Sequence, residues 1–221
     1  GSHNFAQGCK ALNCNTTGSN NHAQGRCALF NNTTGCYNFA FGYQALYCNV
    51  SGCNNTAIGY GTLRTNTTGS NNFAQGLCAL YNNTTGGSNF AQGYAALKCN
   101  TTGSSNHAQG YCALFNNTSG DHNFAFGRYS LSCNTIGSVN FAVGCYALMY
   151  NTTGSNNVGI GYYALMYNAT GANNIGIGCR SLINNCGNDN IALGIYSLTN
   201  VTCGFSNIGI GCCAGCAITT G

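Results

Sequence analysis

The chain repeats one 17-residue pattern of large, small and polar residues. Each repeat opens with a stretch of the type Phe/Ile-Ala-x-Gly, continues with Tyr-x-Ala-Leu, and closes on a polar segment close to Asn-Thr-Thr-Gly-Ser-Asn-Asn. We number the positions of each repeat 1 to 17, with Phe5 at position 1 of the first repeat. Thirteen repeats follow one another in steps of 17, except for one step of 16, and they start at residues 5, 22, 39, 56, 73, 90, 107, 124, 141, 158, 175, 191 and 208.

The start of each repeat predicts a β-strand, because large and small residues alternate there with a period of two. Phe141 and Val143 would share one face of such a strand, and Ala142 and Gly144 the other. The Tyr-x-Ala-Leu stretch is expected to form a second short strand. The polar segment is rich in Asn and Gly, which favour turns, and two glycines in each repeat argue against a pair of helices.

One repeat would therefore form one rung of two short strands and two turns, with neighbouring rungs stacked as parallel strands about 4.8 Å apart. The predicted fold is an all-β, parallel β-solenoid, or β-roll, with thirteen rungs of about 17 residues stapled by disulfides. It would form a single domain over residues 1–221, with four residues from the tail of a preceding repeat at its start and a shortened rung at 175–190. Thirteen rungs would make a rod of roughly 60 Å.

Some positions of the repeat predict contacts between rungs. Position 8 is Leu in twelve of the thirteen repeats, which indicates an aliphatic ladder inside the rungs. Position 17 is Asn from Asn4 to Asn207, and stacked asparagines can form an amide ladder. Position 4 is Gly in every repeat, as expected where a backbone turns or approaches another backbone closely. A second Gly, at position 14 from Gly18 to Gly221, belongs to the turn.

Position 3 changes along the chain, from Gln in most early repeats to Val, Ile or Leu from Val143 onward. The more apolar strands in this part of the chain indicate a subunit contact or a narrower rung. Tyrosines at positions 5 and 6 are expected to stack between rungs rather than to bind sugar.

Charge is scarce, which argues against several functions. The chain has six Lys or Arg and two Asp or Glu, so that 4% of its residues are charged, against about 25% in typical soluble domains. Its two acids, Asp121 and Asp189, are too far apart in sequence to suggest a carboxylate-pair hydrolase or a carboxylate cage for Ca²⁺ or Mg²⁺. Scattered cations form no basic stripe, so nucleic-acid binding is not expected. No set of nucleophile, base and orienting residue is specified, so we expect neither an enzyme nor a cofactor.

Seventeen cysteines indicate a protein outside the reducing cytosol. The expected location is extracellular, or the surface of a cell or particle. The sequence has no initiator Met, no signal peptide and no apolar run of about 18 residues. We therefore expect a processed chain or a segment of a longer one, without a membrane span.

The repeat spacing suggests two kinds of disulfide. One joins equivalent places in neighbouring rungs, where stacked Cα atoms about 4.8 Å apart lie within disulfide range. The other joins position 10 of one rung to position 6 of the next, 13 residues further on. The candidate pairs are Cys36 with Cys53 and Cys186 with Cys203 for the first kind, and Cys14 with Cys27 and Cys99 with Cys112 for the second.

Other cysteines have no such partner, and an odd total leaves at least one free or paired between molecules. Cys9 near one end and the cluster of Cys212, Cys213 and Cys216 near the other would suit covalent head-to-tail linkage of protomers. Cys213 and Cys216 form a lone Cys-x-x-Cys motif without a second such motif or a pair of histidines. This is a weak signal for metal or redox chemistry, and no metal site is expected.

The turn segment repeats the acceptor motif for N-glycosylation, Asn-x-Ser/Thr, which belongs on exposed loops of secreted proteins. Glycans there would solubilise a chain with little charge, although the same segment is also simply a good turn. The principal candidates are Asn15, Asn32, Asn49, Asn66, Asn83, Asn100, Asn117, Asn151, Asn168 and Asn200, with further motifs at Asn31, Asn54, Asn82 and Asn116.

The strand motif, which reads Asn-Phe-Ala-Val-Gly at residues 140–144 and Asn-Ile-Ala-Leu-Gly at residues 190–194, resembles the head repeats of trimeric autotransporter adhesins. The complete 17-residue unit looks more like repeats of phage-type and giant-virus tail-fibre proteins. The resemblance covers essentially the whole chain and implies a parallel β-roll that serves as a spacer or display surface. The high cysteine content departs from those repeats, and no binding residue carries over.

The leading functional hypothesis is a structural protomer of an extracellular fibre that stacks end to end, N-glycosylated and stabilised by disulfides. The chain starts and ends in the turn segment of the repeat without a polar cap, and open β-ends invite pairing with another chain. Self-association could be head-to-tail or lateral. One alternative is the shaft of an adhesin or tail fibre that displays a tip for glycans or a receptor. Another is an ice-binding solenoid, although adjacent threonines such as Thr16 and Thr17 would tend to face opposite ways.

Overall fold

The computed structural model describes residues 1–219, so that the predicted turn glycine Gly221 lies outside the described residues. The described part is all-β and contains no helix. Each rung contributes one three-residue strand at positions 1 to 3, which confirms the predicted first strand. The strands are β1 (Phe5–Gln7), β2 (His22–Gln24), β3 (Phe39–Phe41), β4 (Thr56–Ile58), β5 (Phe73–Gln75), β6 (Phe90–Gln92), β7 (His107–Gln109), β8 (Phe124–Phe126), β9 (Phe141–Val143), β10 (Val158–Ile160), β11 (Ile175–Ile177), β12 (Ile191–Leu193) and β13 (Ile208–Ile210).

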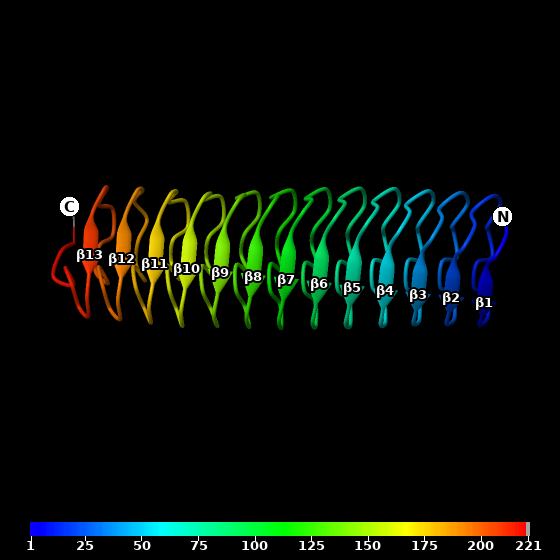
Figure 1. Ribbon diagram of the computed structural model, residues 1–221, viewed down its shortest axis with the longest axis horizontal. Helices are drawn as coiled ribbons and strands as arrows, with labels where there is room; N and C mark the ends of the chain where they lie inside the picture. Colours follow the sequence, from blue (N-terminus) through cyan, green and yellow to red (C-terminus); the bar gives the residue numbers. More distant parts are fainter. Residues whose placement is uncertain (220–221) are drawn as a thin grey trace. The chain divides into compact units, whose positions relative to one another are not determined.

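The chain divides into two compact units, Gly1–Gln109 with β1 to β7 and Gly110–Gly221 with β8 to β13. In each unit the strands lie side by side in chain order, one per turn of the coil (Figure 1). All pairs are parallel, and each strand residue faces the residue at the same position of the next rung, as Phe5 faces His22. The shortened rung keeps this register, because Ile175 pairs with Ile191, 16 residues on. The predicted parallel β-solenoid is thereby confirmed.

The interior of each rung is narrow, because a strand buries only its middle residue. Ala23, Ala40 and Ala57 at position 2 are fully buried, whereas positions 1 and 3 face outward. The predicted leucine ladder is confirmed, since position 8 is fully buried in most rungs. Its buried members are Leu29, Leu46, Leu63, Leu80, Leu97, Leu114, Leu131, Leu148, Leu165, Leu182 and Leu198.

The prediction of a second strand at Tyr-x-Ala-Leu is wrong, because positions 5 to 10 form consecutive turns. Positions 6 and 8 have left-handed backbones, with φ of 58° at Lys10 and 51° at Leu12, whereas a strand needs φ near −120°. Hydrogen bonds between rungs nevertheless continue through the turns, since the Leu12 amide donates to the Ala28 carbonyl oxygen at 3.0 Å. Successive rungs are thus joined by backbone hydrogen bonds well beyond the strands.

The position-4 glycine is required both by its conformation and by a close approach. Gly42 has φ of 139°, a value that favours glycine. A Cβ atom added there would lie 2.3 Å from the carbonyl oxygen of Gly59 in the next rung. The expectation of a turn or a close approach at position 4 is confirmed on both counts. No helix in the described part of the chain has the length and apolar character needed to cross a membrane.

Candidate functional site

Two ladders of asparagine side chains run inside the rungs of each unit. At position 17, the Asn38 side chain donates to the Gly52 carbonyl oxygen at 2.8 Å, and the Asn38 amide donates to Asn21 Oδ1 at 3.0 Å. At position 11, Asn32 Nδ2 donates to Asn15 Oδ1 at 2.8 Å and to the Gly35 carbonyl oxygen at 2.9 Å. Within residues 1–219, every buried side-chain nitrogen and oxygen has a hydrogen-bond partner. The polar interior is therefore fully satisfied and serves to join the rungs.

Most of the predicted glycosylation candidates are members of the position-11 ladder. Nδ2, the atom that would carry a glycan, already donates both to the ladder and to a backbone oxygen, as at Asn32, and a glycan would replace one of the two hydrogens that these contacts use. Asn15 is half-buried in the first rung. The fully buried members are Asn32, Asn49, Asn66, Asn83, Asn100, Asn117, Asn151 and Asn168. Asn200 is exposed, as are Asn54 and Asn116 of the further motifs.

The structure contains no disulfide among the described residues, and all seventeen cysteines are free thiols. The stapling expected in the fold prediction is therefore not seen. At Cys36 and Cys53 the structure shows another role, because both stand at position 15, where Ser is the commonest residue. The Ser19 amide donates to Cys36 Sγ at 3.3 Å, and the Cys36 amide donates to Cys53 Sγ at 3.2 Å. These thiols thus replace a hydroxyl in a side-chain-to-backbone ladder.

The remaining predicted pairs differ in geometry. Cys186 and Cys203, in the shortened rung and the next, are exposed, and their Sγ atoms lie 2.8 Å apart. Cys212 and Cys213 are also exposed, with Sγ atoms 3.7 Å apart, whereas Cys216 is half-buried. Exposure of Cys9 and of the Cys212–Cys213 pair is consistent with the predicted linkage between protomers, which stays a prediction. Cys14, Cys27 and Cys99 are half-buried and Cys112 is buried.

Three thiols have raised pKa values, which makes them weak nucleophiles near neutral pH. The hydrogen bond with Cys203, and then burial, raise the pKa of Cys186 to about 11. The hydrogen bond with Cys212 is the largest cause that raises the pKa of Cys213. Burial raises the pKa of Cys99, and the nearby charge of Lys98 offsets part of that rise. Within residues 1–219, no three His, Cys, Asp or Glu side chains gather where they could hold a metal ion.

Aromatic side chains form ladders on the outer surface of the rungs. At position 1, His22 stacks between Phe5 and Phe39, with ring centroids 4.5 and 4.8 Å away. At position 6, the rings of Tyr146 and Tyr163 stack at 5.1 Å. Tyrosine stacking between rungs is therefore present, as expected from the sequence.

A further ladder, at position 9, combines aromatic rings with the guanidinium group of an arginine. Phe30 stacks on Tyr47 at 5.2 Å, and the guanidinium of Arg64 lies 5.4 Å from the ring of Tyr47 and 5.5 Å from that of Tyr81. Arg64 Nε also donates to Gln44 Oε1 at 2.9 Å. A cation within about 6 Å of an aromatic face is attracted by the ring. Arg64 thus takes the place of a ring between Tyr47 and Tyr81.

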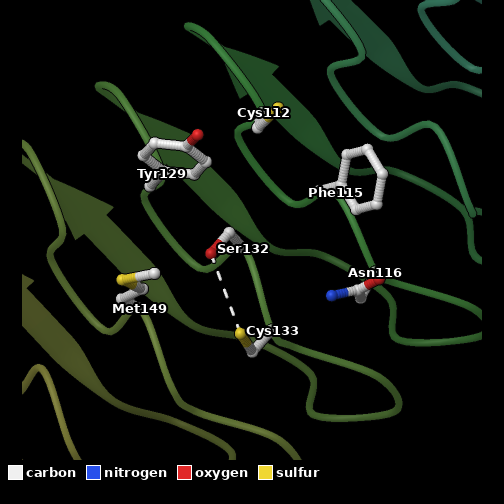
Figure 2. A pocket seen from close by; sticks show the side chains of 7 residues that line it. All are labelled: Cys112, Phe115, Asn116, Tyr129, Ser132, Cys133 and Met149. Atoms are coloured by element: carbon white, nitrogen blue, oxygen red, sulfur yellow. Dashed lines mark hydrogen bonds between the residues drawn. The ribbon is translucent and has the colours of Figure 1, made fainter.

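In the second unit position 9 is Phe115, Ser132 and Met149 in successive rungs, and a hollow of about 260 Å³ lies at the small Ser132. Figure 2 shows Ser132 between Phe115 and Met149, which hold position 9 of the rungs before and after. Ser132 Oγ lies 3.9 Å from Cys133 Sγ. The other lining residues are Cys112, Asn116 and Tyr129. Sequence reasoning missed this site, although the small residue at 132 among larger ones at position 9 was the available signal.

The Cys186–Cys203 thiol pair and the hollow at Ser132 thus depart from the regular ladders. The hollow is concave and mainly apolar, as small-molecule sites are. Comparisons with protein-family models, with curated proteins and with solved structures find no match to this chain.

Proposed function

We propose that this chain is a structural segment of an extracellular fibre in which copies associate with one another. The observation that carries the proposal is that neighbouring rungs are joined by the same contacts throughout each unit. The position-1 amide donates to the position-17 carbonyl oxygen of the next turn at 2.8 Å, at Phe5, at Val158 and at Ile191 alike. Because each rung offers the donors and acceptors of its neighbour, a rung from another copy can be added with the same bonds.

The outer surface of the second unit supports lateral contacts as well. Positions 1 and 3 of β8 to β13 hold only Phe, Val, Ile or Leu. Phe126, Phe141 and Ile177 are 45%, 39% and 38% exposed, although they are apolar. An exposed apolar sheet face rimmed by polar turns is typical of an interaction surface. The second copy is therefore proposed to contact this face.

The extracellular part of the proposal rests on composition and on the resemblance to adhesin and tail-fibre repeats. Seventeen cysteines in a chain with 4% charge suit an oxidising environment. Glycans, where attached to the folded chain, would be carried by exposed acceptor asparagines such as Asn54, Asn116 and Asn200. Under the same resemblance the chain could form the shaft of an adhesin or tail fibre, and a segment that binds a receptor would then lie outside the rungs.

The threonine pairs bear on the ice-binding alternative. At position 12 the hydroxyl is turned to the backbone, as Thr16 Oγ1 donates to the Thr33 carbonyl oxygen at 2.9 Å. At position 13, Thr17 and Thr34 are exposed. The stacked threonine pairs therefore form one row of exposed side chains, at position 13, rather than two. This favours the structural role, and thermal hysteresis of the purified protein would reverse that preference.

Electron microscopy of the native, unreduced protein tests the proposal. We expect filaments whose power spectrum has a layer line at about 4.8 Å, the spacing of stacked strands. The same sample after reduction shows whether cysteines such as Cys9 and Cys212 hold copies together. Isolated particles at every concentration, before and after reduction, would overturn the fibre proposal.

A further inference from the structure

The position-9 ladder of the first unit defines a place that flat groups occupy. From rung to rung, Phe30, Tyr47, Arg64 and Tyr81 follow one another, with aromatic rings and a planar guanidinium stacked 5.2 to 5.5 Å apart. Tyr47 and Arg64 each contact the planar group before and the one after. In these four successive rungs a flat group thus occupies this place on the outer surface, whereas Asn13 and Lys98 hold it in the rungs before and after.

In the second unit, the rung of Ser132 leaves this place without a ring. Ser132 is 4% exposed, and its short side chain ends beside Cys133. Phe115 and Met149 flank the gap two rungs apart, which corresponds to about 9.6 Å at the spacing of parallel strands. A ring placed midway would lie about 4.8 Å from each of them, close to the distances of 5.2 to 5.5 Å at which the groups of the first unit stack. Tyr129 closes the side of the hollow (Figure 2).

We propose that this hollow, the Ser132 slot, binds a small, uncharged, planar aromatic molecule. Its ring takes the ladder place that Ser132 does not fill, between Phe115 and Met149. Aromatic rings stack favourably on one another, and a methionine sulfur makes favourable contacts with a ring. The ladder of the first unit shows the same arrangement with the protein's own side chains, so the slot needs no new backbone geometry.

Size and polarity define the ligand class. The hollow measures about 260 Å³, whereas a cavity of about 150 Å³ holds benzene, so that two fused rings fit the slot. No Lys, Arg, Asp, Glu or His lines it, and its polar side chains are Ser132, Asn116 and the Tyr129 hydroxyl. An uncharged ligand with at most one or two hydrogen-bonding groups is therefore favoured over a charged one.

A fluorescence titration with prodan, an uncharged naphthalene dye whose emission shifts to the blue in apolar surroundings, tests the slot. The chain has no Trp, so dye emission is not obscured. We expect saturable binding of one dye per chain. Ser132→Phe places the missing ring in the ladder and should weaken binding by about tenfold or more, whereas Ser132→Ala keeps the space and should bind as the parent does.

The matched control is Thr199→Phe, which adds the same ring at position 9 of another rung and should leave dye binding unchanged. Protection of Cys133 from alkylation gives a second readout on the unaltered chain. Bound dye should slow iodoacetamide labelling of Cys133 severalfold and leave Cys179, which is also half-buried, at its usual rate. Equal binding by Ser132→Phe and the parent, absence of saturation, or equal labelling of Cys133 with and without dye would each overturn the proposal.

Discussion

At the scale of single residues, the fold depends on backbone conformations that L-amino acids avoid. Three non-glycine positions of the typical rung, 6, 8 and 16, have φ near +50° to +60°, as at Tyr129, Leu131 and Val139. A left-handed residue costs about 1–2 kcal/mol. At Leu131 the cost is offset because its fully buried side chain contributes about 1.5–3 kcal/mol. At an exposed position no such compensation exists.

Val139 is therefore a site where a substitution should stabilise the protein. Val139 has φ of 60° and is 55% exposed, and Asn holds the same position at Asn20 and Asn156. Asn tolerates the left-handed region, whereas a β-branched side chain is strained in it. We expect Val139→Asn to raise the free energy of unfolding by about 1 kcal/mol, as measured by chemical denaturation.

Ile136 provides the control for this prediction. It is equally exposed, at 55%, but it does not have a positive φ. Ile136→Asn makes nearly the same exchange of an apolar side chain for an amide, and should change stability by less than about 0.5 kcal/mol. Equal effects of the two variants would show that hydrophobicity, and not backbone strain, accounts for the result.

The two asparagine ladders show how far the sequence predicted the interior. The position-17 ladder was expected, because Asn recurs there with no other motif attached. At position 11 the Asn-Thr-Thr pattern also matches the glycosylation motif, and this match directed attention to the surface. Asn66 is instead fully buried, and its Nδ2 donates to Asn49 Oδ1 at 2.8 Å. Only the three-dimensional closure of the rung distinguishes the two roles.

At the scale of elements, the sequence predicted the strand and missed the turns. Positions 1 to 3 alternate large and small residues, and this signal survives because a strand exposes and buries alternate side chains. Positions 5 to 8 also carry strand-like residues, yet Leu12 turns inward from a left-handed turn. No local signal marks that conformation, since neither Lys nor Leu favours it. Contacts with the next rung, such as Leu12 amide to Ala28 oxygen, select it.

The shortened rung places two thiols together and predicts a measurable pH dependence. The pKa of Cys186 is raised to about 11, chiefly by its hydrogen bond with Cys203. Because the pKa is raised, the thiol stays protonated, and alkylation should stay slow until the pH approaches that value. Cys203→Ala removes the main cause and should speed alkylation of Cys186 near pH 8.5 by about tenfold, after allowance for the lower nucleophilicity of a less basic thiolate.

Iodoacetamide labelling followed by peptide mass spectrometry measures this rate between pH 7 and pH 11. Cys203→Ser is the matched control, since its hydroxyl can still hydrogen-bond to Cys186 and should preserve part of the effect. Identical pH profiles for Cys186 in the parent and in Cys203→Ala would contradict the assigned cause.

At the scale of the whole molecule, the rungs of the two units have the same architecture, but the outward faces of their strands differ in composition. In the first unit position 3 is Gln in five of seven strands: Gln7, Gln24, Gln75, Gln92 and Gln109. In the second unit the same position is apolar throughout, from Phe126 to Ile210. The sequence showed this drift but could not decide between a narrower rung and a contact surface. The structure places these residues outside, in a rung whose strand still buries only position 2.

The strand face is apolar throughout the second unit, whereas in the first unit glutamines interrupt it, and this difference predicts that lateral association depends chiefly on the second unit. Ile177 and Gln75 occupy position 3 of their strands, and both are exposed. A lysine in the apolar face would bury an unpaired charge in the contact, which is strongly unfavourable. Ile177→Lys should therefore raise the concentration needed for half-maximal association by about tenfold or more, measured by sedimentation velocity. Gln75→Lys introduces the same charge among the position-3 glutamines of the first unit and should associate as the parent does, whereas equal weakening by the two variants would indicate that net charge, not the apolar face, governs association.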